Sequence, residues 1–316
     1  MKVYIPDVWG DSRWGIARGY VHIFEKFSAG LATLGAEVTH DPDADVDIDL
    51  FVTTPGCYRR RREASVLYTM WENTEIDPDH LEKLKLADRV IVPSTWCKEI
   101  FEKHHKAQTS VVPLAIDPIF TRRKRKLKGR FRWLFVGASN YRKGIDVIDD
   151  VWAHLLNNPS MELYMKTTGG SGVDQGIFQT DNNVIVDTRR VEPSQLVDIY
   201  HSADGFLFPT AGEGFGLTLA EAMSTGLPCI CTKYSGHLDF TDESSVFYVE
   251  LDRGGKRPAA NAVDLAKQMK RVMNNYRRAL LKGRAASKAV SRLTWDNSCR
   301  GVYTILSNML GGMNNG

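Results

Sequence analysis

Short apolar runs alternate with amphipathic segments along almost the whole chain. In the first part, the runs that we expect to form buried strands are residues 3–5, 48–52, 65–70, 89–93 and 110–113. Residues 16–34 carry Val21, Phe24, Phe27 and Leu31 at the spacing of one helix face, and residues 81–86 and 95–104 are also expected helices. Strands that alternate with helices predict a parallel sheet covered on both faces.

The alternation starts again after a strongly basic interruption. Seven of the nine residues from 122 to 130 are Lys or Arg, and we predict that they form an exposed linker between two domains. Further strands are expected at 133–136, 162–166, 184–186, 205–208 and 228–231, and helices at 145–156, 194–201, 217–224, 262–291 and 297–309. The pattern thus predicts an α/β fold with two Rossmann-like domains, residues 1–121 and 131–296, followed by a helical segment, 297–316. Ligands of such sheets bind beyond the carboxyl ends of the strands, so two facing sheets would form an interdomain cleft.

Composition narrows the functional classes. A length of 316 residues suits two domains, and 43% hydrophobic with 25% charged residues is the balance of a globular protein. This balance excludes a disordered or fibrous chain. The net charge of +3 is too small for binding to polyelectrolytes by the whole surface, so any basic function must be local.

Neither a metal nor another cofactor is expected. The five cysteines include no C-x-x-C pair, and the alternating aspartates from Asp41 to Asp49 do not form a calcium loop, because Val46 and Val52 stand where Gly and Glu are needed. The first residues cannot form the core of a signal peptide, and no apolar run is long enough to span a membrane. We therefore expect a cytoplasmic protein whose membrane contact, if it has one, is peripheral.

The most informative motif is residues 209–223, at the end of an expected strand and the start of a helix. Its glycines, Gly212, Gly214 and Gly216, would let backbone N–H groups approach an anion at the helix N-terminus. Glu213 and Glu221 would repel a diphosphate but suit hydroxyl groups. A ligand with hydroxyls on both sides of a diphosphate is a nucleotide sugar. Taken alone, the motif also fits a strand end and a helix start without any ligand.

Residues 209–231 closely resemble a hallmark of the retaining glycosyltransferases of family 4, whose GT-B architecture has two facing Rossmann-like domains. The family shows E-x(7)-E within P-S-x-x-E-G-F-G-L-P-x-x-E-A-M-A-x-G-x-P, and Glu213 and Glu221 stand at the two Glu positions. The resemblance implies that Glu213 holds hydroxyls of the donor sugar and that Glu221 holds the ribose. It implies that the backbone of Gly214, Phe215, Gly216 and Leu217 holds the sugar and phosphate.

A second match is residues 135–146, similar to the family's F-V-G-R-x-x-x-x-K-G-x-D. The resemblance gives Gly137 a place in the donor loop and Lys143 the role of gripping the donor diphosphate. Ala138 replaces a second phosphate-binding Arg of many members, and either Arg142 compensates or the diphosphate is bound more weakly. The alternative to diphosphate binding is that Arg142 and Lys143 are a solvent-exposed charged pair before a helix.

The first domain carries weaker matches. Residues 67–74 and 90–97 resemble T-M-[FWY]-E-[ST] and V-P-S-x-[WF] segments of one branch of the family, and Gly15 aligns with the glycine loop that faces the donor phosphates. Glu72 is the candidate for acceptor contact. The helix after residue 296 crosses back to the first domain in the family, and we expect the same for 297–316.

A run of four arginines, Arg59, Arg60, Arg61 and Arg62, follows the expected strand 48–52. If the sheet is wound as argued, this run lies on the cleft side. A solvated loop is one interpretation, and recognition of an anionic acceptor, such as a lipid-linked sugar, an acidic glycan or nucleic acid, is the other.

The resemblance implies a retaining glycosyltransferase that moves a sugar from a nucleotide diphosphate sugar to a hydroxyl acceptor without a metal. Lys143, Arg142 and the helix N-terminus before Leu217 would stabilise the leaving diphosphate, and Glu213 would contact the reacting sugar. Two alternatives stay open at this point. One is a nucleotide-sugar 2-epimerase of the same architecture, and the other is a nucleic-acid-binding protein with a decayed donor site.

Overall fold

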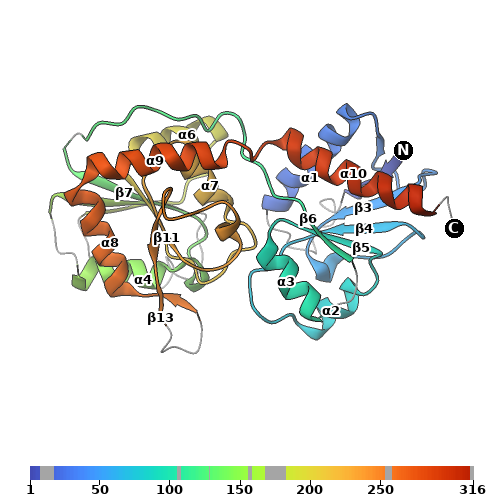
Figure 1. Cartoon of the computed structure of the whole chain (residues 1–316), viewed down its shortest axis with the longest axis horizontal. Coiled ribbons are helices and arrows are strands. Elements are labelled where there is room, and N and C mark those ends of the chain that lie inside the picture. Colours follow the sequence, from blue (N-terminus) through green and yellow to red (C-terminus); the bar gives the residue numbers. More distant parts are fainter. Residues whose placement is uncertain are drawn as a thin grey trace. The chain divides into compact units, whose positions relative to one another are not determined.

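The structure is a computed structural model that describes residues 1–7, 18–104, 108–127, 129–155, 159–167, 183–252 and 258–313. Contacts between residues divide the chain into two compact units (Figure 1). The first unit contains residues 1–115 and 293–316, and the second contains residues 116–292. By its contacts the basic segment 122–130 belongs to the second unit, and the C-terminal helix belongs to the first.

The first unit is built on a six-stranded parallel sheet in the order β2-β1-β3-β4-β5-β6. Its strands are β1 (Lys2–Tyr4), β2 (Glu37–Thr39), β3 (Ile48–Val52), β4 (Ser65–Tyr68), β5 (Arg89–Val92) and β6 (Gln108–Val111). Its helices are α1 (Arg18–Thr33), α2 (Pro78–Leu84), α3 (Thr95–His104) and α10 (Trp295–Met313), with a short 3-10 turn, η2 (Pro55–Cys57). The edge strand β2 was not expected, because it has only three residues and none of them is buried.

Helix α10 packs closely against α1. A side-chain carbon at Gly30 of α1 would lie only 2.2 Å from the sulfur of Cys299 in α10, so a glycine is needed where the helices approach. Trp295 contacts Phe27 edge to face, with 6.0 Å between ring centres, and Ser298 donates a hydrogen bond of 2.7 Å to the carbonyl of Pro113. These contacts join the last helix to α1 and to the segment that follows β6.

The second unit contains another parallel sheet, in the order β12-β11-β10-β7-β8-β9. Its strands are β7 (Phe131–Val136), β8 (Met161–Lys166), β9 (Val184–Asp187), β10 (Gly205–Phe208), β11 (Cys229–Thr232) and β12 (Phe247–Val249), and β13 (Leu251–Asp252) pairs with β14 (Ala259–Ala260). The helices are α4 (Ile145–Asp150), α6 (Pro193–Ser202), α7 (Leu217–Ser224), α8 (Ala262–Asn274) and α9 (Tyr276–Val290). The 3-10 turns η3 (Tyr141–Lys143) and η5 (Gly236–Asp239) and the π-helical turn η4 (Val151–Leu155) complete the unit.

The expected helix 262–291 is interrupted. Asn275 leaves the helical conformation, with φ −134° and ψ 58°, and its side-chain oxygen accepts a hydrogen bond of 3.3 Å from the backbone N–H of Arg278. An Asn that caps a helix start in this way satisfies one of the free donors there. The periodicity of apolar residues continues across the break, and therefore it did not reveal the boundary between α8 and α9.

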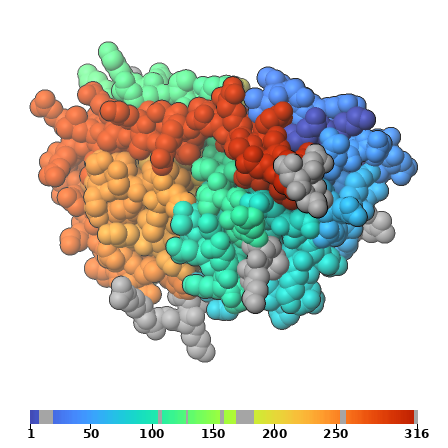
Figure 2. Space-filling view, turned by 45° about the vertical axis from the view of Figure 1, so that its right-hand side comes forward, coloured from blue at the N-terminus to red at the C-terminus, as the bar shows by residue number. Residues whose placement is uncertain are grey.

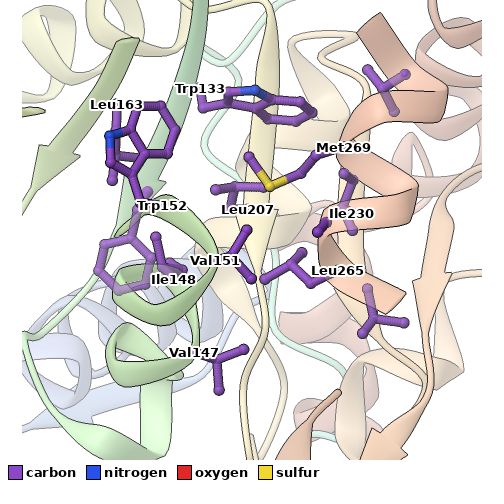
Figure 3. Close-up of a cluster of buried hydrophobic side chains, with 14 of the residues drawn as sticks. Trp133, Val147, Ile148, Val151, Trp152, Leu163, Leu207, Ile230, Leu265 and Met269 are labelled. Carbon is purple, nitrogen blue, oxygen red and sulfur yellow. The ribbon is translucent and has the colours of Figure 1, made fainter. Parts of the chain in front are cut away.

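The core of the second unit lies between its sheet and the pair α4 and α8. Leu207 and Ile230 come from the sheet, Trp152 from η4 and Met269 from α8, and all are buried in one cluster. Figure 3 shows these side chains pointing toward one another from their separate elements. The described helices include none that is long and apolar enough to cross a membrane.

Candidate active site

The candidate site lies at the carboxyl ends of β7 and β10, which are neighbours in the second sheet. The chain leaves β7 toward β8 on one side and leaves β10 toward β11 on the other. The loops after β7 and β10 therefore diverge and open a crevice, the usual place for a ligand in such a sheet. The two motifs singled out in the sequence are these two loops.

Backbone contacts join the loops. The carbonyl of Arg142 accepts a hydrogen bond of 2.7 Å from the N–H of Ala211 and one of 3.1 Å from the hydroxyl of Thr210. Gly144 has a positive φ of 74°, and a side-chain carbon there would lie 2.0 Å from the carbonyl oxygen of Pro209. Only glycine permits this approach, so the K-G pair of the motif places Lys143 at the second loop.

Three charged side chains meet in the crevice. Arg142 donates a hydrogen bond of 3.0 Å to Oε1 of Glu213, and Lys143 donates to the same oxygen. Arg142 also donates to the carbonyl of Gly212 at 2.7 Å. Among the described residues none donates to the other carboxylate oxygen of Glu213, Oε2, which is therefore available to a hydroxyl group.

The charge of Glu213 is fixed by these neighbours. Its side chain is only 7% exposed, and burial alone would raise its pKa. Lys143 and Arg142 outweigh that effect and hold the pKa of Glu213 below its usual value. Glu213 is therefore an anion that accepts hydrogen bonds.

The loop after β10 leads directly into α7. Gly216 precedes the helix in the left-handed conformation, with φ 96°, which brings it against Phe208 and His237. The first N–H groups of a helix have no partner within it, and they attract negative charge. Gly214, Phe215, Gly216 and Leu217 thus form the approach to this helix start, and their role in holding a ligand stays a prediction.

Glu221 lies on α7 in different surroundings. It is buried, and its Oε2 accepts a hydrogen bond of 2.8 Å from the hydroxyl of Tyr200. Burial raises the pKa of Glu221 to about 8, the Tyr200 bond opposes this rise, and the nearby charge of Asp117 adds to it. A protonated Glu221 can donate as well as accept a hydrogen bond.

Two residues of the site were missed in the sequence. Ser235 is the only non-glycine residue of positive φ in the described part of the chain, and its hydroxyl accepts a hydrogen bond of 3.0 Å from the N–H of Glu213. Strained backbone of this kind gathers at functional sites. The only signal in the sequence was a Ser-Gly pair, Ser235-Gly236, after a strand, which is common in turns.

His237 is the second missed residue. It is fully buried, and its Nε2 lies 2.7 Å from the carbonyl of Thr232, which can only accept, so Nε2 carries the proton. Burial lowers the pKa of His237 to about 4, which makes the ring neutral at pH 7. Its Nδ1 is left as an acceptor without a partner among the described residues.

Other sequence candidates lie elsewhere. Gly137 follows β7 directly, and its N–H donates 3.1 Å to the carbonyl of Lys166. Glu72 belongs to the first unit, four residues beyond the end of β4. Gly15 lies outside the described residues. In the described part of the chain no cluster of three or more His, Cys, Asp or Glu could hold a metal ion.

The expected position of the run Arg59 to Arg62 is wrong. Arg62 pairs at 2.8 Å with Asp49, near the start of β3, and Arg60 pairs at 2.9 Å with Asp88, just before β5. The chain returns across the sheet after η2, so the run lies at the amino ends of the strands and not at the carboxyl ends. The sequence did not show that the chain has already passed from the carboxyl end of β3 to the amino end of β4 where these arginines occur.

The run also has structural partners. Asp49 is fully buried, and burial raises its pKa although Arg62 opposes the rise. Arg61 and Arg62 lie over the ring of Tyr4 at 5.3 and 5.4 Å. The acceptor role that rested on the expected position loses that support.

Comparisons with known proteins agree with this arrangement. Residues 130–275 match the family model described as Glycosyl transferases group 1. A D-inositol 3-phosphate glycosyltransferase of Corynebacterium kroppenstedtii is 25% identical over 182 residues, which are 54% of this chain and 39% of that protein. A glycogen synthase of Thermodesulfovibrio yellowstonii is 26% identical over 180 residues, 56% of this chain and 35% of that protein. Each match spans less than half of the relative's own length.

Solved structures resemble almost the whole chain. A sucrose-phosphate synthase of Thermosynechococcus elongatus superposes with a TM-score of 0.75 at 15% identity, over 99% of this chain and 100% of that one. Anabaena HepE, solved with UDP and glucose, gives 0.74 at 14% identity, over 98% and 100%. At such identities the likeness concerns the fold, and it confirms the architecture expected from the sequence. The chain therefore has the GT-B fold, and its residues 130–275 are similar to the group 1 glycosyl transferases.

Proposed function

We propose that the protein is a retaining glycosyltransferase that moves a sugar from a nucleoside diphosphate sugar to a hydroxyl acceptor without a bound metal. The observation that carries the proposal is the group of Glu213, Arg142 and Lys143 beside the start of α7. It combines an anionic hydrogen-bond acceptor with two cations and the N-terminus of a helix, the features that a sugar, a diphosphate and a developing negative charge require.

The cations and the helix would bind the diphosphate. Arg142 and Lys143 together carry one more charge than Glu213 neutralises, and the N-terminus of α7 adds donors. Charge grows on the leaving phosphate as the glycosidic bond breaks, and cations already in place stabilise it without reorganisation. The charge stabilisation that a metal supplies in other enzymes would come here from the protein.

Glu213 would hold the sugar. Its Oε1 is bound by both cations, which leaves Oε2 to accept a hydrogen bond from a sugar hydroxyl. A carboxylate with a lowered pKa and two ion pairs is a poor nucleophile, so we do not assign it a covalent role. Instead, the acceptor oxygen forms its bond to the anomeric carbon on the face from which the phosphate oxygen leaves, and the leaving phosphate takes the acceptor's proton.

Glu221 would hold the ribose of the nucleotide, and Glu72 would contact the acceptor. Support for a nucleotide sugar also comes from Anabaena HepE, whose structure contains UDP and glucose, and support for glycosyl transfer comes from the name of the D-inositol 3-phosphate glycosyltransferase. The donor base, the sugar and the acceptor are matters for experiment.

A panel of nucleotide sugars tests the proposal. Calorimetry identifies the donor that binds, and its hydrolysis or transfer is followed with candidate hydroxyl acceptors. We expect release of the nucleoside diphosphate and a product of unchanged anomeric configuration. An inverted product would refute the retaining mechanism, and conversion of the donor into its 2-epimer without an acceptor would refute transfer.

A further inference from the structure

The second unit exposes a basic surface away from the candidate active site. It consists of the segment that precedes β7 and the outer side of α9, and we call it the basic face. Its cations are exposed: Arg122, Arg123, Lys124, Lys126, Arg277, Arg284 and Lys288. Figures 1 and 2 show the segment, in green, running beside α9, in orange-red, and both elements line one small pocket that includes Arg122, Leu280 and Arg284.

The helix contributes one continuous stripe. Arg277, Leu281, Arg284 and Lys288 recur at the spacing of one side of a helix and are all exposed, whereas Ala279, Gly283, Ala286 and Val290 on the opposite side are buried. At 1.5 Å per residue, α9 is roughly 22 Å long. The stripe is therefore an extended cationic ridge, and the basic segment lies along it.

The charge of this surface is not balanced locally. Residues 118–131 and residues 265–295 contain no Asp or Glu. In the part of the chain that the structure describes, none of the seven cations forms an ion pair. Because the net charge of the whole chain is only +3, the residues outside the basic face are together net acidic.

Arg125 shows that the segment is held in place. Its guanidinium donates to the carbonyls of Ala203 at 2.5 Å and Tyr200 at 3.1 Å, at the end of α6, and to the hydroxyl of Thr225 at 3.1 Å. This residue satisfies the free carbonyls of a helix end, and the arginines and lysines around it point to solvent. Arg125 thus has a structural role, whereas the exposed Arg122, Lys124 and Lys126 form no side-chain hydrogen bond or ion pair among the described residues.

An exposed leucine indicates what this surface meets. Leu281 is 56% exposed in the middle of the stripe, one turn from Arg277 and from Arg284, and Leu127 is 42% exposed at the end of the basic segment. Cations that surround exposed aliphatic side chains suit the boundary between lipid headgroups and acyl chains. Single-stranded nucleic acid would need aromatic stacking partners, and the exposed aromatic side chain that the structure describes, Tyr141, lies in the loop after β7.

We propose that the basic face docks the protein on anionic phospholipid membranes, with the cations near the headgroups and Leu281 inserted between them. The surface lies on the unit that carries the candidate donor site. Its segment cations Arg123, Lys124 and Lys126 lie near the amino end of β7, whereas that site is at the carboxyl end. Docking therefore leaves the crevice uncovered. This inference does not depend on the proposed reaction.

Vesicle cosedimentation tests it, with vesicles of phosphatidylcholine alone and vesicles that also contain phosphatidylglycerol. We expect the full chain to bind the anionic vesicles only and to dissociate as salt rises. Each Lys or Arg near an anionic surface strengthens binding about fivefold, so the pair R284E and K288E should lower the partition coefficient at least about 25-fold. The matched control is K267E with K270E, the same charge change on exposed residues of α8.

The apolar contact has its own pair of variants. Leu281→Ala should weaken vesicle binding about 5- to 50-fold, because methylene groups leave the lipid, whereas Val263→Ala, at an even more exposed position on α8, should not. Folding of every variant is checked by circular dichroism. No binding to anionic vesicles, equal binding to neutral ones, or equal losses in the α8 controls would overturn the proposal. So would salt-sensitive binding to RNA that depends on Arg284 and Lys288 but not on Leu281.

Discussion

Glu213 and Glu221 are eight residues apart in the same motif and are both buried, yet their surroundings give them opposite acid–base properties. Glu213 faces Lys143 and Arg142, which keep its pKa below the usual value. Glu221 faces the hydroxyl of Tyr200 and, in the part of the chain that the structure describes, no cation, and its pKa rises to about 8. Burial disfavours the anionic form of both glutamates. The loop after β7 supplies Lys143 and Arg142, which compensate this effect at Glu213 only.

The difference suggests separate tasks. An anion locked between two cations can bind a hydroxyl and stay charged while negative charge develops nearby. A carboxyl group that titrates near neutrality is suited to a neutral hydrogen-bonding partner such as ribose. Substitutions at Glu213 and at Glu221 test these two tasks separately.

The largest effect is expected for Glu213. Changing it to Gln removes a charge-assisted hydrogen bond worth about 1.5–3 kcal/mol, so donor turnover should fall roughly 10- to 150-fold, mainly in kcat. Binding of the free nucleoside diphosphate should be unchanged or tighter, because Arg142 and Lys143 are released to the phosphates. Turnover assays and calorimetry measure the two effects separately.

The control for this variant is Glu162→Gln. Glu162 also pairs with an arginine, Arg132 at 2.6 Å, but at the amino end of β8. Its loss should leave turnover unchanged. Weaker diphosphate binding in the Glu213 variant would show that the assignment of Glu213 to the sugar is wrong.

The cation side of the comparison is tested by Lys143→Met. The diphosphate should bind about tenfold more weakly, since Arg142 remains. Burial of Glu213 would then be less opposed, its pKa would rise, and the acidic limb of the pH profile of kcat should move to higher pH. Lys267→Met, on the exposed side of α8, should change neither property, and an unmoved acidic limb would exclude the coupling between Lys143 and Glu213.

Glu221 should make stability depend on pH. Its folded pKa of about 8 lies above its ordinary value of 4.5, so its contribution is fully present below about pH 4.5 and is lost as the pH rises toward 8. The loss is at most about 1.4 kcal/mol per pH unit. Thermal unfolding of wild type and Glu221→Gln between pH 5 and 8 measures it, because the Gln variant lacks the titration. Parallel pH profiles would contradict the raised pKa.

Glu221→Ala tests whether Glu221 contacts the ribose of the nucleotide. Because the ribose is common to both molecules, this change should weaken binding of the free nucleoside diphosphate and of the intact donor equally, by roughly 2- to 12-fold, the worth of a hydrogen bond between neutral groups. A loss confined to the intact donor would mean that Glu221 contacts the sugar.

The sequence predicted the parts of this site that depend on local pattern. The strand end and the glycines of residues 209–223 indicated Glu213 and the start of α7, and the resemblance of residues 135–146 to the family motif indicated Arg142 and Lys143. The alternation of elements predicted two parallel sheets, although it missed β2 and the break at Asn275, and the resemblance to family 4 implied the GT-B fold.

The sequence pattern did not predict contacts between segments that are distant along the chain. Ser235 and His237 come to the site only because β11 lies beside β10 and the following turn closes over Gly216. Nor does the pattern show that Lys143 and Arg142 share one oxygen of Glu213, since that depends on the approach that Gly144 permits. The opposite pKa shifts of the two glutamates follow from these contacts and not from the motif.

The smallest effect on activity is expected for the arginine run, Arg59 to Arg62, which resembles Arg142 and Lys143 in residue type only. Arg62 compensates the buried Asp49 at the amino end of the first sheet, far along β3 from its carboxyl end. Arg62→Ala should leave donor hydrolysis unchanged and lower the stability of the first unit by about 1–3 kcal/mol, because a buried carboxylate loses its partner. Arg59→Ala is the control, since Arg59 is exposed and donates to the nearby carbonyls of Gly56 and Tyr58. Thermal unfolding and acceptor kinetics separate the two interpretations. A raised acceptor KM at unchanged stability would support a role of the run in acceptor binding. Lost stability at unchanged KM would show that Arg62 stabilises the first unit and does not bind the acceptor.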